Sequence, residues 1–115
     1  KKAKEPILDL KTISLNALSE LYYSSSKDTE PSIFYYRMSE ILRNYISKEY
    51  DFDAMEMTPS EFFEAVKKII PETININELK NYLKLFTLAQ YAAFKPSDKE
   101  NENSFNYTKE LLEKL

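Results

Sequence analysis

The chain of 115 residues contains no glycine, and this absence limits both how its backbone can turn and which sites it can build. Glycine readily adopts positive φ and lets a ligand approach the backbone closely, because it has no Cβ. A P-loop, a dinucleotide-binding glycine motif, a nucleophile elbow and an EF-hand loop all depend on it. These sites are therefore excluded, and helix ends must be formed by capping side chains and by the five prolines.

Histidine, cysteine and tryptophan are absent as well. Without histidine and cysteine the chain cannot form a common zinc cluster, a disulfide framework or the usual catalytic triads. The net charge is −3 and the two signs are interspersed, which disfavours non-specific binding of nucleic acid. We therefore predict a protein that is not an enzyme, uses no cofactor or metal, and does not bind nucleic acid.

Acidic side chains are the remaining route to catalysis or metal binding. Four of them lie near predicted helix starts, where a pair at fixed separation could hydrolyse a glycoside: Glu61, Glu64, Glu72 and Glu78. Helix capping already accounts for Glu61 and Glu78. The acidic segment 51–56 lacks the glycine and the spaced glutamate of a calcium loop, so we expect a solvent-facing loop there.

Helical periodicity and helix-start signals divide the chain into five segments. Thr58 and Ser97 each precede a glutamate by three residues, as in a capping box, and Asn75 precedes Glu78 in the same way. We expect helices over 6–23, 30–50, 58–70, 75–94 and 97–115, with Asp28 or Thr29 capping the second. The predicted fold is all-α, a single compact, bundle-like domain of about five helices spanning 1–115.

Apolar side chains at helical spacing mark the expected inner face of each helix. These faces are Leu10, Ile13, Ala17, Leu18 and Leu21; Phe34, Met38, Ile41, Leu42, Tyr45 and Ile46; Phe62, Phe63, Val66 and Ile69; Leu79, Tyr82, Leu83, Phe86, Ala89, Gln90 and Ala93; and Ser104, Phe105, Thr108, Leu111, Leu112 and Leu115.

Several aromatic and basic side chains fall off these faces. Tyr35, Tyr36, Arg37 and Tyr91 are therefore candidates for a protein-binding surface, an exposed aromatic groove between helices. Arg43 has a planar guanidinium in the middle of a helix and could pair with a carboxylate from another element. That pair would be a structural salt bridge, with contact to a partner as the alternative.

The first six residues include Lys1, Lys2 and Lys4. A basic cluster of this kind is typical of the cytoplasmic flank of a transmembrane helix, so residues 1–6 could be a tether next to a removed membrane segment. A solvated start to the helical domain explains them equally well. No stretch of the sequence approaches the 18 apolar residues of a membrane span.

Three stretches resemble a known family. They are FYYRMSEILRNYI at 34–46, MTPSEF at 57–62 and LAQYAAFKPS at 88–97. Together they are similar to the small helical domain that follows the transmembrane helix in BatD-like membrane proteins of bacterial Bat (aerotolerance) gene clusters, and to related short proteins encoded beside MoxR-type ATPases and von Willebrand type A proteins. The resemblance covers roughly residue 7 to the end.

Single positions carry this resemblance. Those that match the family pattern are Arg43, Tyr45, Thr58, Glu61 and Phe94. The family often has an acidic residue and a lysine shortly before the alanine and phenylalanine turn, where this chain has Thr87 and Gln90. This departure puts a role for charge at those two positions in doubt.

The resemblance implies a non-enzymatic interaction module at the cytoplasmic face of the inner membrane, part of a longer membrane protein. Its implied partners are a MoxR-type ATPase or von Willebrand type A proteins. Composition also permits a secreted or surface-anchored helical ligand-binding protein of an AT-rich bacterium. A helix-turn-helix module built from the third and fourth helices is a further alternative, disfavoured by net acidity and by a connector containing Pro71.

Overall fold

A computed structural model describes residues 9–25 and 29–115 of the chain. Its helices are α1 (Leu10–Ser24), α2 (Pro31–Tyr50), α3 (Pro59–Lys67), α4 (Ile76–Tyr91) and α5 (Asp98–Lys114), with the short 3-10 helix η1 (Ala54–Glu56) between α2 and α3. The described residues contain no strand. The predicted all-α fold of five helices is confirmed.

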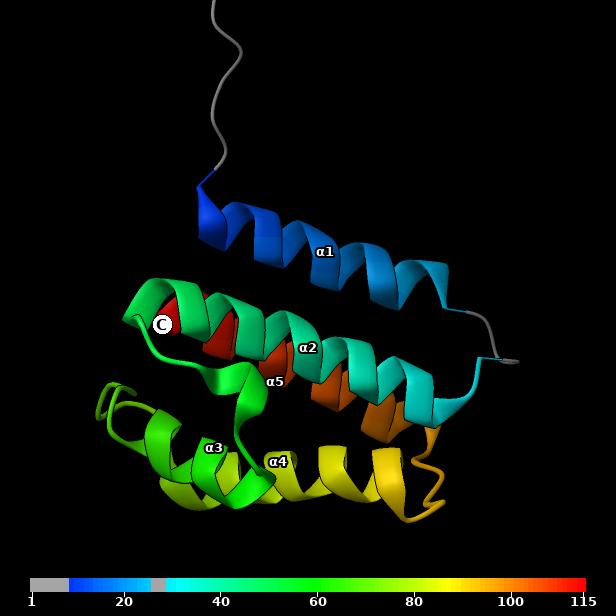
Figure 1. Cartoon of the computed structure of the whole chain (residues 1–115). Helices are drawn as coiled ribbons and strands as arrows, with labels where there is room; N and C mark the ends of the chain where they lie inside the picture. The colour runs from blue at the N-terminus through cyan, green and yellow to red at the C-terminus, as the bar shows by residue number, and fades with distance from the viewer. Residues whose placement is uncertain (1–8, 26–28) are drawn as a thin grey trace, which may run out of the picture.

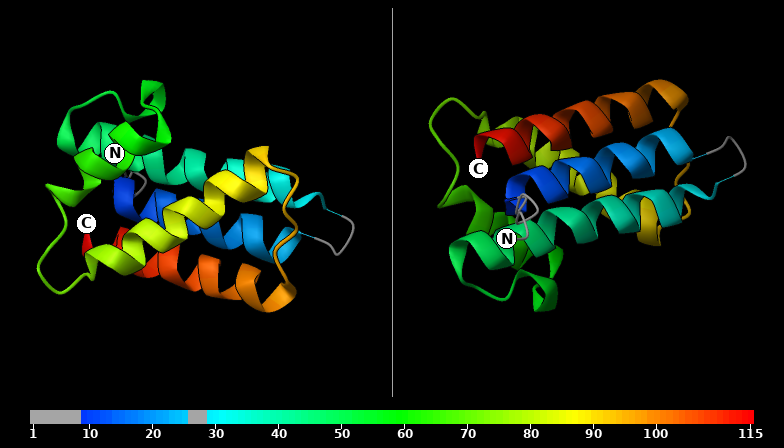
Figure 2. Two further views of the ribbon diagram at one scale, coloured as in Figure 1. Left: turned by 90° about the horizontal axis from the view of Figure 1, so that it is seen from below. Right: turned by 90° about the horizontal axis from the view of Figure 1, so that it is seen from above.

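The helices are stacked in layers around α2. In Figures 1 and 2, α2 and α5 lie side by side, α1 covers one side of this pair, and α4 with α3 covers the other. Helix α2 contacts α1, α4, α5 and η1, so it is the central helix of the bundle. Its neighbours α1 and α4 both run in the direction opposite to α2 (Figure 1).

The hydrophobic core lies between these layers and agrees with most of the expected faces. On α2 the buried side chains include Met38, Leu42, Tyr45 and Ile46. On the last helix the whole expected face is buried, from Ser104 to Leu115. One contiguous cluster includes side chains from all five helices, so the described residues share a single core.

The face of α1 differs from the expected one. Ile13 was placed in the core, yet half of its surface (50%) is exposed, whereas Ser14 is buried with only 4% exposed. Helix α1 packs against both α2 and α5 through a stripe centred on Ser14 and Leu18, which are one turn apart. A small side chain at Ser14 allows close approach there, and this turns Ile13 toward solvent.

The N-terminal caps of α3, α4 and α5 are those predicted from the sequence. Thr58 and Ser97 both form complete capping boxes, and the Asn75 side chain accepts from the amide of Glu78. Helix α1 begins at Leu10 and is capped by Asp9, whereas a start at residue 6 was expected. The cap of α2 is Glu30, which makes no side-chain cap hydrogen bond. The alternative cap Asp28 and the predicted tether at 1–6 lie outside the described residues.

Two helices end earlier than expected. Helix α3 ends at Lys67, three residues before the predicted end, and α4 ends at Tyr91, where an end at residue 94 was expected. After α4, Ala93 adopts φ 54°, which turns the chain out of the helix before the buried Pro96. Among residues 9–25 and 29–115, no helix is both long enough and apolar enough to cross a membrane.

Candidate functional site

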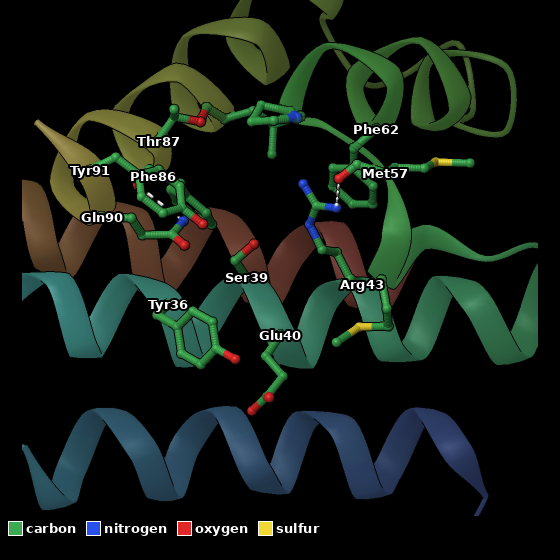
Figure 3. A pocket seen from close by; sticks show the side chains of 13 residues that line it. Tyr36, Ser39, Glu40, Arg43, Met57, Phe62, Phe86, Thr87, Gln90 and Tyr91 are labelled. Carbon is green, nitrogen blue, oxygen red and sulfur yellow. Dashed lines mark hydrogen bonds between the residues drawn. The ribbon is translucent and has the colours of Figure 1, made fainter.

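A groove between α2, α3 and α4 brings together most of the predicted interaction residues. We call it the α2–α4 groove; its cavity measures about 180 Å³ (Figure 3). Its lining residues are Tyr36, Ser39, Glu40, Arg43, Met55, Met57, Pro59, Phe62, Leu83, Phe86, Thr87, Gln90 and Tyr91.

Three of the five predicted interaction residues line this groove. They are Tyr36 and Arg43 on α2 and Tyr91 at the end of α4. Tyr36 and Tyr91 expose 53% and 74% of their surface, as their helical phase predicts. Arg37 is also exposed, but it does not line the groove. The structure therefore places two exposed aromatic rings and one cation at a single hollow.

The prediction that Tyr35 lies off the core face is wrong. Its side chain is fully buried, and its hydroxyl donates to Asn101 Oδ1 at 2.9 Å and lies 3.1 Å from Ser104 Oγ. Its ring meets Phe86 edge to face with centroids 5.3 Å apart. Because α2 is covered by α1, α4 and α5, its buried arc is wider than its apolar stripe. Burial raises the pKa of Tyr35 to about 12.

Arg43 anchors the connection between α2 and α3. Its Nη1 donates to the carbonyl oxygens of Ala54 at 2.7 Å and Met57 at 2.6 Å. Its guanidinium carbon lies 4.4 Å from the ring centroid of Phe62, in a cation–π contact. The prediction that Arg43 forms a salt bridge is wrong, because its acceptors are the backbone carbonyl oxygens of Ala54 in η1 and of Met57. Desolvation lowers the pKa of Arg43.

The floor of the groove consists of residues that sequence analysis did not assign to a site. Met57 and Phe62 flank the start of α3, and Phe86 comes from the middle of α4. Met55 lies in η1, within the segment expected to be a solvent-facing loop, and exposes 44% of its surface. Amphipathic patterning marks Phe62 and Phe86 only as core, since it carries no information on where the core opens to solvent.

Polar side chains of α4 at the groove are mostly bonded within their own helix. The Thr87 hydroxyl donates to the carbonyl of Leu83, and the Gln90 amide donates to the carbonyl of Phe86, each at 3.1 Å.

The carboxylate of Glu61 accepts from the amide of Thr58 at 2.9 Å, so capping accounts for it. In the described part of the chain, no group of three or more acidic side chains is placed to hold a metal ion.

Comparison of the chain with protein-family models, with curated protein sequences and with solved structures finds no match. The resemblance to the BatD-like domain therefore stays a prediction.

Proposed function

We propose that the chain is a non-enzymatic protein-interaction module and that the α2–α4 groove is its docking surface. The observation that carries this proposal is the pair of exposed rings, Tyr36 and Tyr91, that border one cavity with an apolar floor. Tyrosine supplies a large contact area with little loss of side-chain entropy, and it is enriched at protein interfaces. Arg43 adds a cation held in a fixed position by two backbone carbonyls.

We further propose that the partner is a MoxR-type ATPase or a von Willebrand type A protein, and that the domain belongs to a membrane-anchored, Bat-type protein with its interaction surface in the cytoplasm. The resemblance supports this identity. One of its matching positions, Arg43, is also a groove residue, whereas Thr58 and Glu61 serve the start of α3. The native reading frame tests the tether: a transmembrane segment encoded directly before Lys1 supports it.

Replacing the exposed tyrosines tests the docking surface. We expect Tyr36→Ala and Tyr91→Ala each to weaken partner binding roughly tenfold or more, the usual effect of losing an aromatic anchor. Stability should change by no more than about 0.5 kcal/mol, because both side chains are largely exposed. Affinity is measured by biolayer interferometry against the MoxR-type and von Willebrand type A proteins encoded beside this chain, which we call the neighbouring proteins. Stability is measured by urea unfolding.

Tyr23→Ala is the matched control. Tyr23 exposes 77% of its surface and lies on α1, which covers the opposite side of the α2–α5 pair. If this variant weakens binding as much as Tyr91→Ala, the groove is not the docking surface. If none of the neighbouring proteins binds the wild-type chain, the proposed partners are wrong. An upstream lipoprotein signal ending in cysteine would then favour the secreted ligand-binding alternative.

A further inference from the structure

Arg43 has hydrogen-bonding capacity that the described residues leave unused. A guanidinium carries five N–H donors, and the two backbone carbonyls at Ala54 and Met57 take only those on Nη1. Among residues 9–25 and 29–115, the ion pairs within 4.0 Å are Glu64–Lys67, Lys99–Glu102 and Glu110–Lys114, none of which involves Arg43. A partly buried cation therefore lies in the groove without a carboxylate.

The nearest acidic side chain in the groove does not neutralise this charge. Glu40 precedes Arg43 by three residues on α2 and also lines the cavity, but its carboxylate points away from the guanidinium (Figure 3). The two carbonyls on Nη1 and the ring of Phe62 fix the plane of the guanidinium. Its remaining Nε and Nη2 donors are held in the fork arrangement that matches a carboxylate.

Part of the groove lining near Arg43 is apolar, alongside the polar side chains of Ser39, Glu40, Thr87 and Gln90. Met57, Phe62, Leu83 and Phe86 line the cavity, whose volume of about 180 Å³ is sufficient for one apolar side chain. A low-dielectric wall of this kind strengthens an ion pair formed beside it. An aromatic or branched apolar side chain next to an acidic one would therefore satisfy both parts of the groove.

We propose that the α2–α4 groove binds an acidic peptide segment of the partner, in which an Asp or Glu side chain pairs with Arg43 and a neighbouring apolar side chain occupies the floor. This inference rests on the proposed docking function and names the chemistry that the docking surface recognises. Charge complementarity at Arg43 selects an acidic segment over a neutral or basic one.

A second hollow continues the groove beyond Tyr91. It measures about 300 Å³ and shares Gln90 and Tyr91 with the first. Its lining includes one acidic and one basic residue, Glu30 and Lys95, as the first hollow does with Glu40 and Arg43. The peptide can extend along this second hollow, with its acidic side chain at the end where Arg43 lies.

Two blocked tripeptides test the proposal on the wild-type chain. Both are N-acetylated and C-amidated; one reads Phe-Glu-Leu and the other Phe-Gln-Leu, so they differ only in the side-chain charge. Titration into the ¹⁵N-labelled chain is followed through the Nε–Hε signal of Arg43 and the amides of the groove. We expect the Glu peptide to bind roughly tenfold more tightly than the Gln peptide, the effect of a charge-assisted hydrogen bond.

Two protein variants and one further peptide test whether the difference between the peptides depends on Arg43. Arg43→Gln should abolish the difference between the two peptides, whereas Arg37→Gln, on the same helix but outside the groove, should keep it. Arg43→Gln also removes two backbone contacts, so its fold is checked by circular dichroism; the comparison of peptides on the wild-type chain needs no variant. A Phe-Gln-Leu peptide with a free C-terminal carboxylate tests whether Arg43 pairs with a chain terminus and not with an acidic side chain.

Equal binding of the blocked Glu and Gln peptides would overturn the inference. Binding of the free-acid Gln peptide as tight as that of the blocked Glu peptide would also overturn it, because the groove would then recognise a C-terminal carboxylate. These outcomes are separate from those of the proposed function. If partner proteins bind through Tyr91 while the peptides do not differ, docking stands and the acidic segment is wrong. If the peptides differ as expected and no neighbouring protein binds, the acidic site stands and the named partners are wrong.

Discussion

Two buried tyrosines on neighbouring helices differ in what their hydroxyls contact. The hydroxyl of Tyr35 lies within hydrogen-bonding distance of Asn101 and Ser104. The hydroxyl of Tyr107 is buried without a hydrogen-bond partner among the described residues, although its ring stacks on Tyr82 with centroids 4.1 Å apart. An unpaired buried hydroxyl destabilises a fold by about 1–3 kcal/mol, whereas a paired one contributes about 1 kcal/mol. The same chemical group therefore has opposite effects at the two positions.

Removing each hydroxyl in turn tests this contrast. We expect Tyr35→Phe to lower the free energy of unfolding by about 1–2 kcal/mol, because Asn101 and Ser104 lose a buried partner. Tyr107→Phe keeps the stacked ring and should leave stability unchanged or raise it by up to about 1 kcal/mol. Urea unfolding followed by circular dichroism measures both. Equal losses in the two variants would mean that the Tyr107 hydroxyl has a partner in solution.

At the scale of helices, a chain without glycine uses different devices at the two ends. The N-termini of α1, α3, α4 and α5 are capped by side chains, as in the capping boxes of Thr58 and Ser97. After α2 and α4 the chain turns through non-glycine residues at positive φ, with Asp51 at 53° and Ala93 at 54°. Aspartate tolerates this conformation better than alanine, which pays about 1 kcal/mol for it. The end of α4 is therefore strained at Ala93.

Glycine substitution at adjacent positions tests the strain. Ala93→Gly should raise the free energy of unfolding by about 0.5–1 kcal/mol, because it removes the Cβ clash at positive φ. Ala92→Gly is the matched control: Ala92 is also exposed but has φ −112°, so glycine there should lower stability by about 0.5–1 kcal/mol through chain entropy. Thermal unfolding of both variants gives the sign. A loss at both positions would show that Ala93 is unstrained.

Across the whole molecule, burial keeps several tyrosines neutral. It raises the pKa of Tyr35 to about 12, and it also raises the pKa of Tyr107, Tyr45, Tyr50 and Tyr82. In the unfolded chain these groups ionise near the ordinary value of about 10. Because the folded pKa values are higher, the corresponding stability is complete below about pH 10 and is lost as pH rises toward the folded values.

An alkaline titration tests this dependence. We expect the melting temperature to change little between about pH 7 and 9 and to fall progressively between about pH 10 and 12. Tyrosinate absorbance from the buried rings, such as Tyr35 and Tyr107, should then appear together with unfolding. A melting temperature that stays constant up to about pH 11 would contradict the assignment of the buried tyrosines.

The starts of α3, α4 and α5 were predicted correctly from sequence because a cap depends on only a few adjacent residues. Thr58 and Glu61, for example, satisfy each other's backbone amides within one turn. The helical fold class follows equally from local patterning. Helix ends were predicted less well, since Ala93 leaves the helix in a backbone conformation that no local motif marks.

Spacing along a single helix was sufficient to predict the all-helical fold, the N-terminal caps of α3, α4 and α5, and the exposure of Tyr36 and Tyr91. Three other properties depend on tertiary packing: the burial of Tyr35, the contacts of Arg43 with backbone carbonyls, and the position of Phe86 at the groove floor. These properties depend on which helices cover α2 and where they leave it uncovered. That arrangement is a balance of packing among all five helices, which spacing along a single helix does not encode.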